Sequence, residues 1–518
     1  MRKLHIFIIM LFLSLCLFGC DQEGGQFGKT DKGVSYENYL DERFDSSIFY
    51  QNYGSVIGAD PTVITVGDEY YLYVTNADGT DCSFIQGFKS KDLMNWEWLG
   101  RVFIPNRGAW AITSLWAPEV IEKDGTYYMY YSGYDINYQC MGIGVAVADN
   151  PAGPFAEYSG TLVDGTVITH EQSPFDYVLK EYSSDFKAID PAVFIDDDGK
   201  AYLYLSQDQV NRESSIYGME LDADMVSIKR DTITGPLVQT SQNWESPDAA
   251  SRWNEAPFMI KNNGKYYLTY SANYYASSLY AVGYAVSDSP LGEFEKPIDN
   301  PILQATEEWP FISGPGHCSF FPSADGTELY MAYHSHIDVG SAGDVRKINF
   351  DKVVFKDGKL IVNGPSVSPQ LLPSGSSDYK NITSLATVDA GEYDSSIIVD
   401  GVINTLYTRV DTHEIYFENK TTITFTFSKE VNVKAILVYD STDYLASATS
   451  YDLKFANDNV GKVLFNNNYR YLDEFGYEIK IPTTASIIQF EGIKTNSITF
   501  TFEAGVAISE IIIVGGEN

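Results

Sequence analysis

The sequence predicts an all-β protein made of a five-bladed β-propeller followed by a β-sandwich. Three observations support this prediction: a tyrosine-rich hairpin motif that recurs five times, a scarcity of long amphipathic helical stretches, and a change of pattern near Pro373, after which the motif is not seen again. With 518 residues, the chain is long enough for two or three domains that each bury a core of their own.

The repeated motif is a short apolar strand, a Gly-containing turn and a second strand rich in Tyr, which is the pattern of a β-hairpin. Its copies include "ADPTVITVGDEYYLYVT" from Ala59 and "IDPAVFIDDDGKAYLYLS" from Ile189. The motif's anchor prolines lie roughly sixty to seventy residues apart, a spacing that suits a four-stranded blade, and they are Pro61, Pro118, Pro191, Pro257 and Pro315. Two β-sandwiches in series would explain the alternation of apolar and polar residues, but they would leave the repeat unexplained.

The C-terminal part has a different pattern. The segment "PSGSSDYKN" is a Pro/Gly/Ser linker, and alternating β-branched strands such as "TTITFTFSKEVNVKAILVYD" follow it. We therefore expect a propeller over residues 47–372, a linker over 373–384 and an accessory β-sandwich over 385–518. The paired "ITFTF" strands resemble discoidin-like or galactose-binding-like jelly rolls.

The N-terminal residues predict export. Arg2 and Lys3 precede an apolar stretch that ends at Gly19, Cys20 and Asp21, which is typical of a secretory signal. This segment resembles a bacterial lipoprotein signal over residues 1–20, which implies that Cys20 is lipidated and holds the chain on a cell-envelope membrane. Residues 21–46 are polar and Gly-rich, and we expect a flexible tether there. Ordinary secretion, with Cys20 incidental, is the alternative.

Charge and cysteine content exclude some classes of function. The chain has 35 Lys and Arg against 70 Asp and Glu, so a surface that binds nucleic acid is disfavoured. Beyond the signal segment only Cys82, Cys140 and Cys318 remain, too widely spaced for a metal knuckle, and at most one disulfide can form among them.

The propeller prediction brings three acidic residues together. Asp60 and Asp190 each precede the anchor proline of a blade, and Glu255 lies two residues before its own. The starts of the innermost strands open on one face of a propeller, so these residues are expected to be neighbours. Clustered carboxylates raise at least one pKa, which acid/base chemistry uses. This arrangement favours glycoside cleavage by a carboxylic acid and a carboxylate.

In their order and spacing, the segments "ADP", "WAPE", "SKDLMNW", "IDPAVF", "NEAPFM" and "GPGH" resemble glycoside hydrolase family 43 over roughly residues 58–369. The resemblance implies an inverting enzyme in which Asp60 is the general base, Asp190 orients the acid and adjusts its pKa, and Glu255 is the general acid. Inversion requires about 6.5–9.5 Å between the base and acid carboxyls. We expect repulsion from Asp190 to raise the pKa of Glu255.

Three further residues are expected at the site. Trp116 is a candidate wall against a sugar face, with blade packing as the alternative. His317 falls where the family often has a histidine that holds a calcium ion through waters or touches substrate, whereas a lone His is commonly structural. Arg346 matches an arginine near the family's active centre, with a surface ion pair as the alternative. No cofactor is required for the chemistry.

The expected substrate is a plant-type polysaccharide or oligosaccharide, and α-L-arabinofuranosidase is the expected activity. β-Xylosidase, endo-arabinanase and galactofuranosidase stay open because loops set the shape of the pocket. A non-catalytic glycan-binding lipoprotein is the competing class, and the presence of all three acids disfavours it. A related family that retains configuration on fructosides starts with an Asn-Asp-Pro-Asn run, which this sequence lacks.

Overall fold

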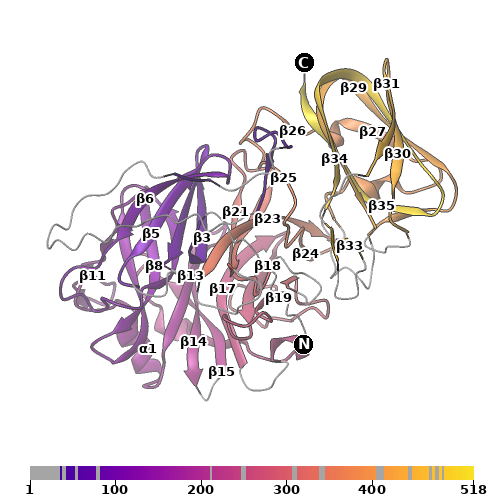
Figure 1. Cartoon of the computed structure of the whole chain (residues 1–518). Helices are drawn as coiled ribbons and strands as arrows, with labels where there is room; N and C mark the ends of the chain where they lie inside the picture. The colour runs from indigo at the N-terminus through magenta and orange to yellow at the C-terminus, as the bar shows by residue number, and fades with distance from the viewer. Residues whose placement is uncertain are drawn as a thin grey trace, which may run out of the picture. The chain divides into compact units, whose positions relative to one another are not determined.

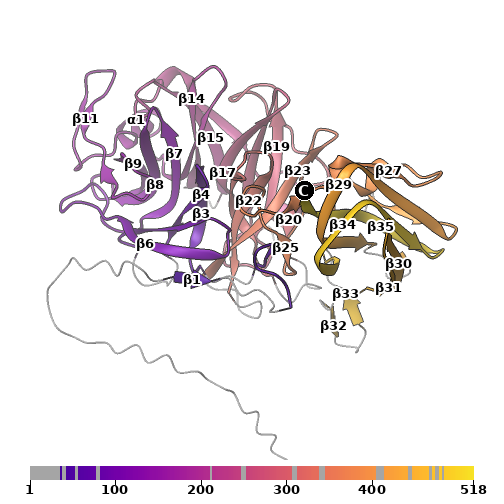
Figure 2. The same ribbon diagram turned by 90° about the horizontal axis from the view of Figure 1, so that it is seen from above.

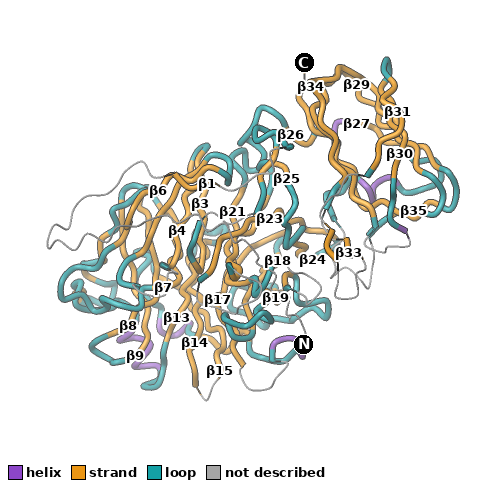
Figure 3. The backbone as a smooth tube through the Cα atoms, in the orientation of Figure 1, coloured by secondary structure: helices purple, strands orange, loops and turns teal. Residues whose placement is uncertain are grey.

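The computed structural model describes residues 35–37, 43–52, 56–76, 82–210, 213–246, 252–305, 312–337, 345–403, 413–441, 446–465, 470–472, 478–480 and 484–517. Strands and loops make up nearly all of this part of the chain (Figure 3). The predicted signal segment and Cys20 lie outside the described residues. Within them, no helix has the length and apolar character needed to cross a bilayer.

The first two blades are antiparallel sheets. Blade 1 has the strand order β1-β6-β5-β4-β3, and blade 2 the order β10-β9-β8-β7. Their strands are β1 (Ser35–Glu37), β3 (Ala59–Val66), β4 (Glu69–Thr75), β5 (Ile85–Ser90), β6 (Asn95–Phe103), β7 (Trp116–Lys123), β8 (Thr126–Asp135), β9 (Cys140–Ala148) and β10 (Ala156–Glu157). A small hairpin and a helix follow blade 2, namely β11 (Gly160–Thr161), β12 (Val167–Ile168) and α1 (Asp176–Tyr182).

Blades 3 and 4 share one sheet, because β15 and β17 pair in parallel. Their elements are β13 (Ala188–Ile195), β14 (Ala201–Val210), β15 (Glu213–Leu221), η1 (Arg230–Thr232), β16 (Thr234–Val238), η2 (Asn243–Glu245), β17 (Arg252–Asn262), β18 (Lys265–Ala272), β19 (Ala281–Ser287) and β20 (Leu303–Gln304). Blade 5 consists of β21 (Gly316–Pro322), β22 (Leu329–His336), β23 (Arg346–Lys356) and β24 (Lys359–Val362).

The five innermost strands form a closed ring, since β3 contacts β7, β7 contacts β13, β13 contacts β17, β17 contacts β21 and β21 contacts β3. Figures 1 and 2 show the blades following one another from indigo through magenta to orange. Blade 5 is joined to blade 1 by a hydrogen bond of 3.0 Å from the Gly58 N–H to the Arg346 carbonyl. The ring confirms the predicted five-bladed propeller.

Tyrosine is frequent in the second strands because it links neighbouring blades. A separate apolar core lies between each pair of adjacent blades. In four of the five blades a tyrosine of the second strand donates its hydroxyl to a backbone carbonyl of the next blade; the pairs are Tyr73 with Pro151, Tyr130 with Met225, Tyr204 with Pro290 and Tyr267 with Gly358. A buried tyrosine needs such a partner for its hydroxyl. These tyrosines therefore build the blade interfaces.

Every innermost strand has a β-bulge near its start, with one residue in the left-handed region. These residues are Asp60 (φ 52°), Ala117 (φ 47°), Asp190 (φ 54°), Ala256 (φ 54°) and His317 (φ 49°). A bulge redirects side chains and bends the strand, and bulges are common beside active sites. Proline follows the left-handed residue in the first four blades, but Cys318 follows it in the fifth. The prediction of Pro315 as the fifth anchor was therefore wrong, because His317 sets the register of that blade.

Backbone hydrogen bonds tie the bulges to the preceding blades. The N–H of a left-handed residue donates to a side chain in the second strand of the preceding blade at four of the five junctions; the pairs are Asp60 with His334, Ala117 with Thr75, Asp190 with Ser132 and His317 with Ser271. At the fifth junction the Ala256 N–H donates instead to Asp190 Oδ2 at 3.0 Å. Ser206 is the residue of blade 3 equivalent to Ser132 and Ser271, and its buried hydroxyl has no hydrogen-bond partner among the described residues.

The C-terminal residues form a second set of strands around a core of their own. Its sheet has the order β26-β35-β29-β34-β30-β31, with β27 on β29 and β28 on β35. The elements are β26 (Lys380–Asn381), η3 (Thr383–Leu385), β27 (Ala386–Asp389), η4 (Ser395–Ile398), β28 (Ile415–Phe417), β29 (Thr421–Asp440), β30 (Ser450–Phe455), β31 (Asn459–Leu464), β32 (Arg470–Leu472), β33 (Glu478–Lys480), β34 (Ser486–Phe502) and β35 (Val506–Glu517). The long strand β29 pairs with both β34 and β35, so the sheet curls around the core. The discoidin-like resemblance stays a prediction.

Short strands occur in both of the segments predicted to be a tether and a linker. Within 21–46, β1 pairs with β6 of blade 1, and within 373–384, β26 pairs with β35 of the C-terminal sheet. At the two ends of the predicted propeller segment, β2 (Phe49–Tyr50) pairs with β25 (Gln370–Leu371). This pairing joins the beginning and the end of the propeller segment.

Candidate active site

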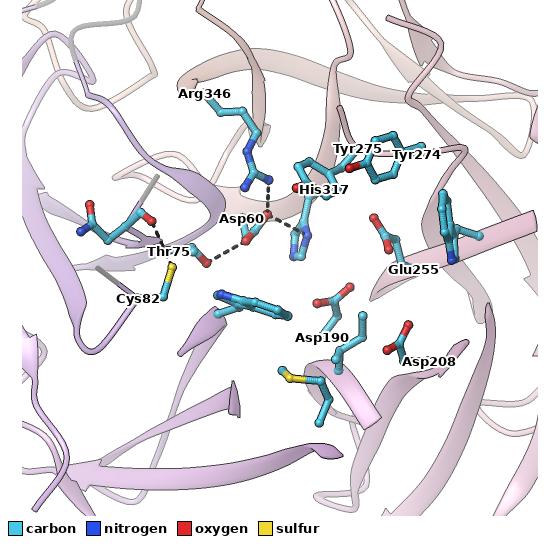
Figure 4. A pocket seen from close by; sticks show the side chains of 15 residues that line it. Asp60, Thr75, Cys82, Asp190, Asp208, Glu255, Tyr274, Tyr275, His317 and Arg346 are labelled. Carbon is cyan, nitrogen blue, oxygen red and sulfur yellow. Dashed lines mark hydrogen bonds and ion pairs between the residues drawn. The ribbon is translucent and has the colours of Figure 1, made fainter. Parts of the chain in front are cut away.

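A cavity of about 520 Å³ opens where the innermost strands begin, a size usual for small-molecule sites. It is lined by all six residues that the sequence predicted for the propeller site, Asp60, Trp116, Asp190, Glu255, His317 and Arg346, and also by Thr75, Asn76, Cys82, Met141, Ile189, Asp208, Trp253, Tyr274 and Tyr275. Figure 4 shows the carboxyl groups of Asp60, Asp190, Asp208 and Glu255 around one space.

The bulges explain how residues far apart in the sequence reach the same cavity. Asp60, Asp190 and His317 occupy the left-handed position of their blades. Trp116 and Glu255 come from the position just before it. Two adjacent positions of one repeated feature therefore supply five of the six predicted residues, and Arg346 is the sixth, at the first position of β23.

Asp60 lies among cationic and hydrogen-bonding groups that favour its ionised form. Arg346 Nη1 is 3.1 Å and His317 Nδ1 is 3.2 Å from Asp60 Oδ1, while the Thr75 hydroxyl donates to Oδ2 at 2.7 Å. Burial acts to raise the pKa of the Asp60 carboxyl, but His317 and Arg346 hold it well below its usual range. Because burial also lowers the pKa of His317, the permanent charge of Arg346 accounts for most of this effect near neutral pH.

His334 supports Asp60 as a neutral group. Its Nδ1 accepts the Asp60 backbone N–H at 3.1 Å, so this nitrogen is unprotonated. Burial and the charge of Arg346 lower the pKa of His334 to about 3. The separation of 3.4 Å between His334 Nδ1 and Asp60 Oδ1 is therefore not an ion pair. His334 orients the Asp60 backbone rather than supplying charge.

Glu255 has the opposite electrostatic environment. Burial, followed by the negative charges of Asp60 and Asp208, raises the pKa of Glu255 to about 7, although a hydrogen bond from Tyr280 opposes the shift. Burial and the charge of Glu255 also raise the pKa of Asp190 well above its usual range. Asp190 and Glu255 thus form a coupled pair that holds a proton near neutral pH. The repulsion between these two residues raises the pKa of Asp190, whereas the charges that raise the pKa of Glu255 are those of Asp60 and Asp208, so the expectation that Asp190 raises the pKa of Glu255 stays a prediction.

Tyr280 holds the Glu255 carboxyl in place. Its hydroxyl donates to Glu255 Oε1 at 2.8 Å, and its ring stacks on His334 with centroids 5.6 Å apart and an interplanar angle of 6°. The ring fits only because blade 5 has Gly316 at the position of Glu255, where a Cβ would lie 2.2 Å from a Tyr280 ring carbon. The glycine therefore makes room for the tyrosine that orients the acid.

Sequence reasoning missed Thr75, Asp208 and Tyr280. Thr75 is the last residue of β4. Asp208 directly follows Gln207, the last residue of β14 before its register shifts. In a hairpin the end of the second strand is adjacent to the start of the first, so these positions could have been found by applying the register to both strands. Tyr280 precedes β19 in a loop, and no repeat marks it.

The described residues do not by themselves complete a calcium site. Among them, no group of three or more His, Cys, Asp or Glu side chains could hold a metal ion. His317 offers nitrogen, whereas Ca²⁺ prefers six to eight oxygen ligands, and its carboxylate neighbour Asp60 is already paired with Arg346. Within the described residues, Cys82, Cys140 and Cys318 are not joined to one another by a disulfide.

Comparisons with known proteins agree with this site. The family model for glycosyl hydrolases family 43 matches residues 53–360. A β-D-galactofuranosidase of Aspergillus niger is 29% identical over 318 residues, which cover 59% of this chain and 81% of that protein. An arabinoxylan arabinofuranohydrolase of Paenibacillus polymyxa is 28% identical over 348 residues, which cover 59% of this chain and 49% of that protein.

A solved structure, that of a thermostable family-43 glycoside hydrolase, is 36% identical with a TM-score of 0.54, and the match covers 62% of this chain and 99% of that one. A carboxyl of lowered pKa and one of raised pKa in the same propeller cavity fit the base and the acid of a glycoside hydrolase. This chain belongs to glycosyl hydrolases family 43. It is accordingly an O-glycoside hydrolase of an inverting family.

Proposed function

We propose that the chain hydrolyses α-L-arabinofuranosides of plant-type polysaccharides or oligosaccharides with inversion of configuration. The observation that carries the mechanism is the opposite pKa shift of two carboxyls in one cavity, since the pKa of Asp60 is held well below its usual range and that of Glu255 is raised to about 7. Near neutral pH, Asp60 is thus a ready base and Glu255 retains a proton to donate.

In this mechanism Asp60 removes a proton from a water molecule that attacks the anomeric carbon, and Glu255 protonates the departing oxygen on the opposite side of the sugar. Asp190 orients the acid and adjusts its pKa, because its carboxylate is tied to the Ala256 N–H directly after Glu255. Trp116 contributes an aromatic wall of the cavity, which suits packing against the apolar face of a sugar.

A β-D-galactofuranoside is the second candidate substrate. It is favoured by the similarity to the galactofuranosidase of Aspergillus niger, which extends over 81% of that protein. The two sugars share the configuration of the furanose ring and differ in the length of the chain on C4. The room beside that carbon therefore decides between them, and β-xylosidase and endo-arabinanase activities are the remaining alternatives within the family.

The test is a panel of aryl α-L-arabinofuranoside, β-D-galactofuranoside and β-D-xyloside together with linear and branched arabinan. We expect cleavage of the arabinofuranoside, with an inverted anomer as the first product by NMR. Glu255→Gln should lower the rate on poor leaving groups by about 10²- to 10⁴-fold, while Glu213→Gln, an exposed glutamate paired with Arg252, serves as the control. Binding of glycans without cleavage would favour the non-catalytic alternative.

Two further proposals concern the calcium ion and the membrane. We propose that any calcium near His317 is coordinated through waters and is not needed for the chemistry, so the enzyme should stay active after chelation; loss of activity that calcium restores would contradict this. We also propose that Cys20 is lipidated and anchors the chain to a bacterial envelope membrane. Metabolic labelling with a fatty-acid analogue should label the chain but not the Cys20→Ser variant.

A further inference from the structure

Two aromatic side chains in the cavity have no part in the proposed chemistry. Trp253 is half-buried, Tyr274 is 45% exposed, and both line the cavity. Their rings contact each other with centroids 5.2 Å apart and an interplanar angle of 43°. We call this pair the aromatic platform. Exposed aromatic surface inside a cavity is typical of a binding site, because such rings offer a flat apolar face to a ligand.

The strand geometry places Trp253 on the same side of β17 as the acid. Asn254 and Glu255 pair in regular register with Ala272 and Ser271, and the bulge begins only after Glu255. Side chains alternate along a regular strand, so Trp253 and Glu255 point to the same face, about 7 Å apart along it. Asn254 between them is fully buried. Arg252, the residue before Trp253, is exposed, so Trp253 lies on the outer side of the acid.

The geometry of the inverting reaction indicates which part of the substrate lies beside the aromatic platform. In an inverting displacement the water and the leaving group occupy opposite sides of the sugar, with the water beside the base and the leaving group beside the acid. Figure 4 shows Tyr274 on the Glu255 side of Asp60. The aromatic platform therefore borders the path of the leaving group rather than that of the water.

The loop that carries Tyr274 is held in place before any ligand arrives. Asn273 has a left-handed backbone (φ 76°) and donates its side-chain amide to the carbonyls of Trp244 and Leu279 at 2.9 and 2.8 Å. The Ser277 N–H donates to the Tyr274 carbonyl at 2.7 Å. On the other side, parallel pairing of Trp253 with Ser214 fixes the strand. A preorganised platform loses little entropy on binding.

The neighbouring Tyr275 has a different role. The Arg346 guanidinium lies over its ring, 4.8 Å from the centroid, and Arg346 in turn pairs with Asp60. Tyr275 therefore supports the base side of the cavity. Its ring also contacts the Tyr274 ring, with centroids 4.8 Å apart, so Tyr275 joins the base side of the cavity to the aromatic platform.

We propose that Trp253 and Tyr274 form the subsite that binds the first sugar of the leaving group, so that the enzyme prefers substrates in which the departing group is itself a saccharide. The C–H face of a pyranose or furanose ring packs on the indole, and the tyrosine borders its edge. This inference rests on the proposed function, because it takes Glu255 as the acid.

The test compares two substrates with the glycone that the panel identifies. One is an oligosaccharide, and the other is the glycosyl fluoride, whose leaving group is too small to touch the platform. Trp253→Ala should lower kcat/KM for the oligosaccharide by roughly ten- to a hundredfold, the range expected for losing a buried apolar contact. Hydrolysis of the fluoride should be unchanged, Trp253→Phe should recover part of the loss, and Tyr274→Ala should show a smaller loss of the same kind.

The matched control is Tyr416→Ala, which removes a tyrosine that is 52% exposed in the C-terminal part and should change neither substrate. Equal losses on both substrates in Trp253→Phe and Tyr274→Ala would overturn the proposal, as would an undiminished rate on the oligosaccharide. If Trp253→Ala disturbs β17, the results for Trp253→Phe and Tyr274→Ala decide whether the proposal holds. Should the wild-type enzyme cleave neither substrate, the proposed function itself fails, which is a distinct outcome.

Discussion

Replacement of Tyr280 by Phe tests whether Glu255 is the general acid. The Tyr280 hydroxyl donates to Glu255 Oε1 at 2.8 Å, and a hydrogen bond to a carboxylate favours its charged form. The hydroxyl therefore lowers the pKa of Glu255, against the burial that raises it to about 7. Phenylalanine keeps the ring that stacks on His334 and removes only the donor, so the pKa of Glu255 should rise further.

The size of the shift follows from the strength of the bond. A hydrogen bond to a charged group contributes about 1.5–3 kcal/mol, and one pKa unit corresponds to about 1.4 kcal/mol. In an open cavity a water molecule can compensate for part of the lost hydrogen bond, so we expect the pKa of Glu255 to rise by about one unit in Tyr280→Phe. A general acid must be protonated, and activity is lost as the pH rises through its pKa. The alkaline decline of kcat/KM should therefore move to higher pH by about one unit.

The assay is the pH dependence of kcat/KM on an unactivated oligosaccharide between about pH 5 and 10. The control is Tyr284→Phe on β19, whose hydroxyl accepts the Leu360 N–H at 3.4 Å and which is not part of the cavity lining; its profile should match the wild type. Because Asp190 and Glu255 titrate as a coupled pair, the alkaline decline of kcat/KM gives a pKa that belongs to the pair. An alkaline limb that stays in place or moves to lower pH in Tyr280→Phe would refute the reasoning.

Three other predictions follow from buried carboxyls. Arg346→Met removes the cation beside Asp60, so the acidic limb of the same profile should move up by about one pH unit; an unmoved limb would exclude Arg346 as the cause. Burial raises the pKa of Glu119 to about 8, so its contribution to stability is full below the unfolded pKa of 4.5 and is lost as the pH rises to 8. Glu119→Gln should therefore increase the free energy of unfolding in urea by up to about 5 kcal/mol at pH 9 but by little at pH 4. Burial and Asp135 raise the pKa of Asp176 well above its usual range, so Asp176, like Glu119, lowers the stability of the fold as the pH rises. Asp176→Asn should therefore raise the Tm at pH 8, and a lower Tm would contradict this.

The repeat made much of the site predictable. The five copies of the motif show which positions are equivalent, and a closed ring of blades brings equivalent positions close together. Asp60 and Asp190 share the left-handed position, and Glu255 stands one residue before it in its own blade. The sequence therefore predicted these neighbours without any knowledge of side-chain contacts. Trp116, which directly precedes the left-handed position of blade 2, also lines the cavity.

The rest of the site depends on features that a repeat does not encode. Tyr280 reaches Glu255 from a loop, and its place depends on the absence of a side chain at Gly316. The neutral state of His334 depends on burial and on which nitrogen accepts the Asp60 N–H. Such facts arise from packing in three dimensions. The position of the loop residue Tyr280 and the neutral state of His334 were therefore beyond reach of the sequence, while strand positions were not.

The one break in the pattern of the ring explains why Asp190 differs from Asp60. At the junctions entering blades 2, 3 and 5 a hydroxyl accepts the bulge N–H. Between blades 3 and 4 the Asp190 carboxylate takes this role, and the equivalent Ser206 hydroxyl has no hydrogen-bond partner in the part of the chain that the structure describes. Asp190 is thus fixed by the backbone that immediately follows Glu255. Asp60, by contrast, directs its carboxylate to Arg346 and His317. The same position in two blades therefore yields an ionised base in one and a partner of the acid in the other, because the groups that satisfy each carboxylate differ.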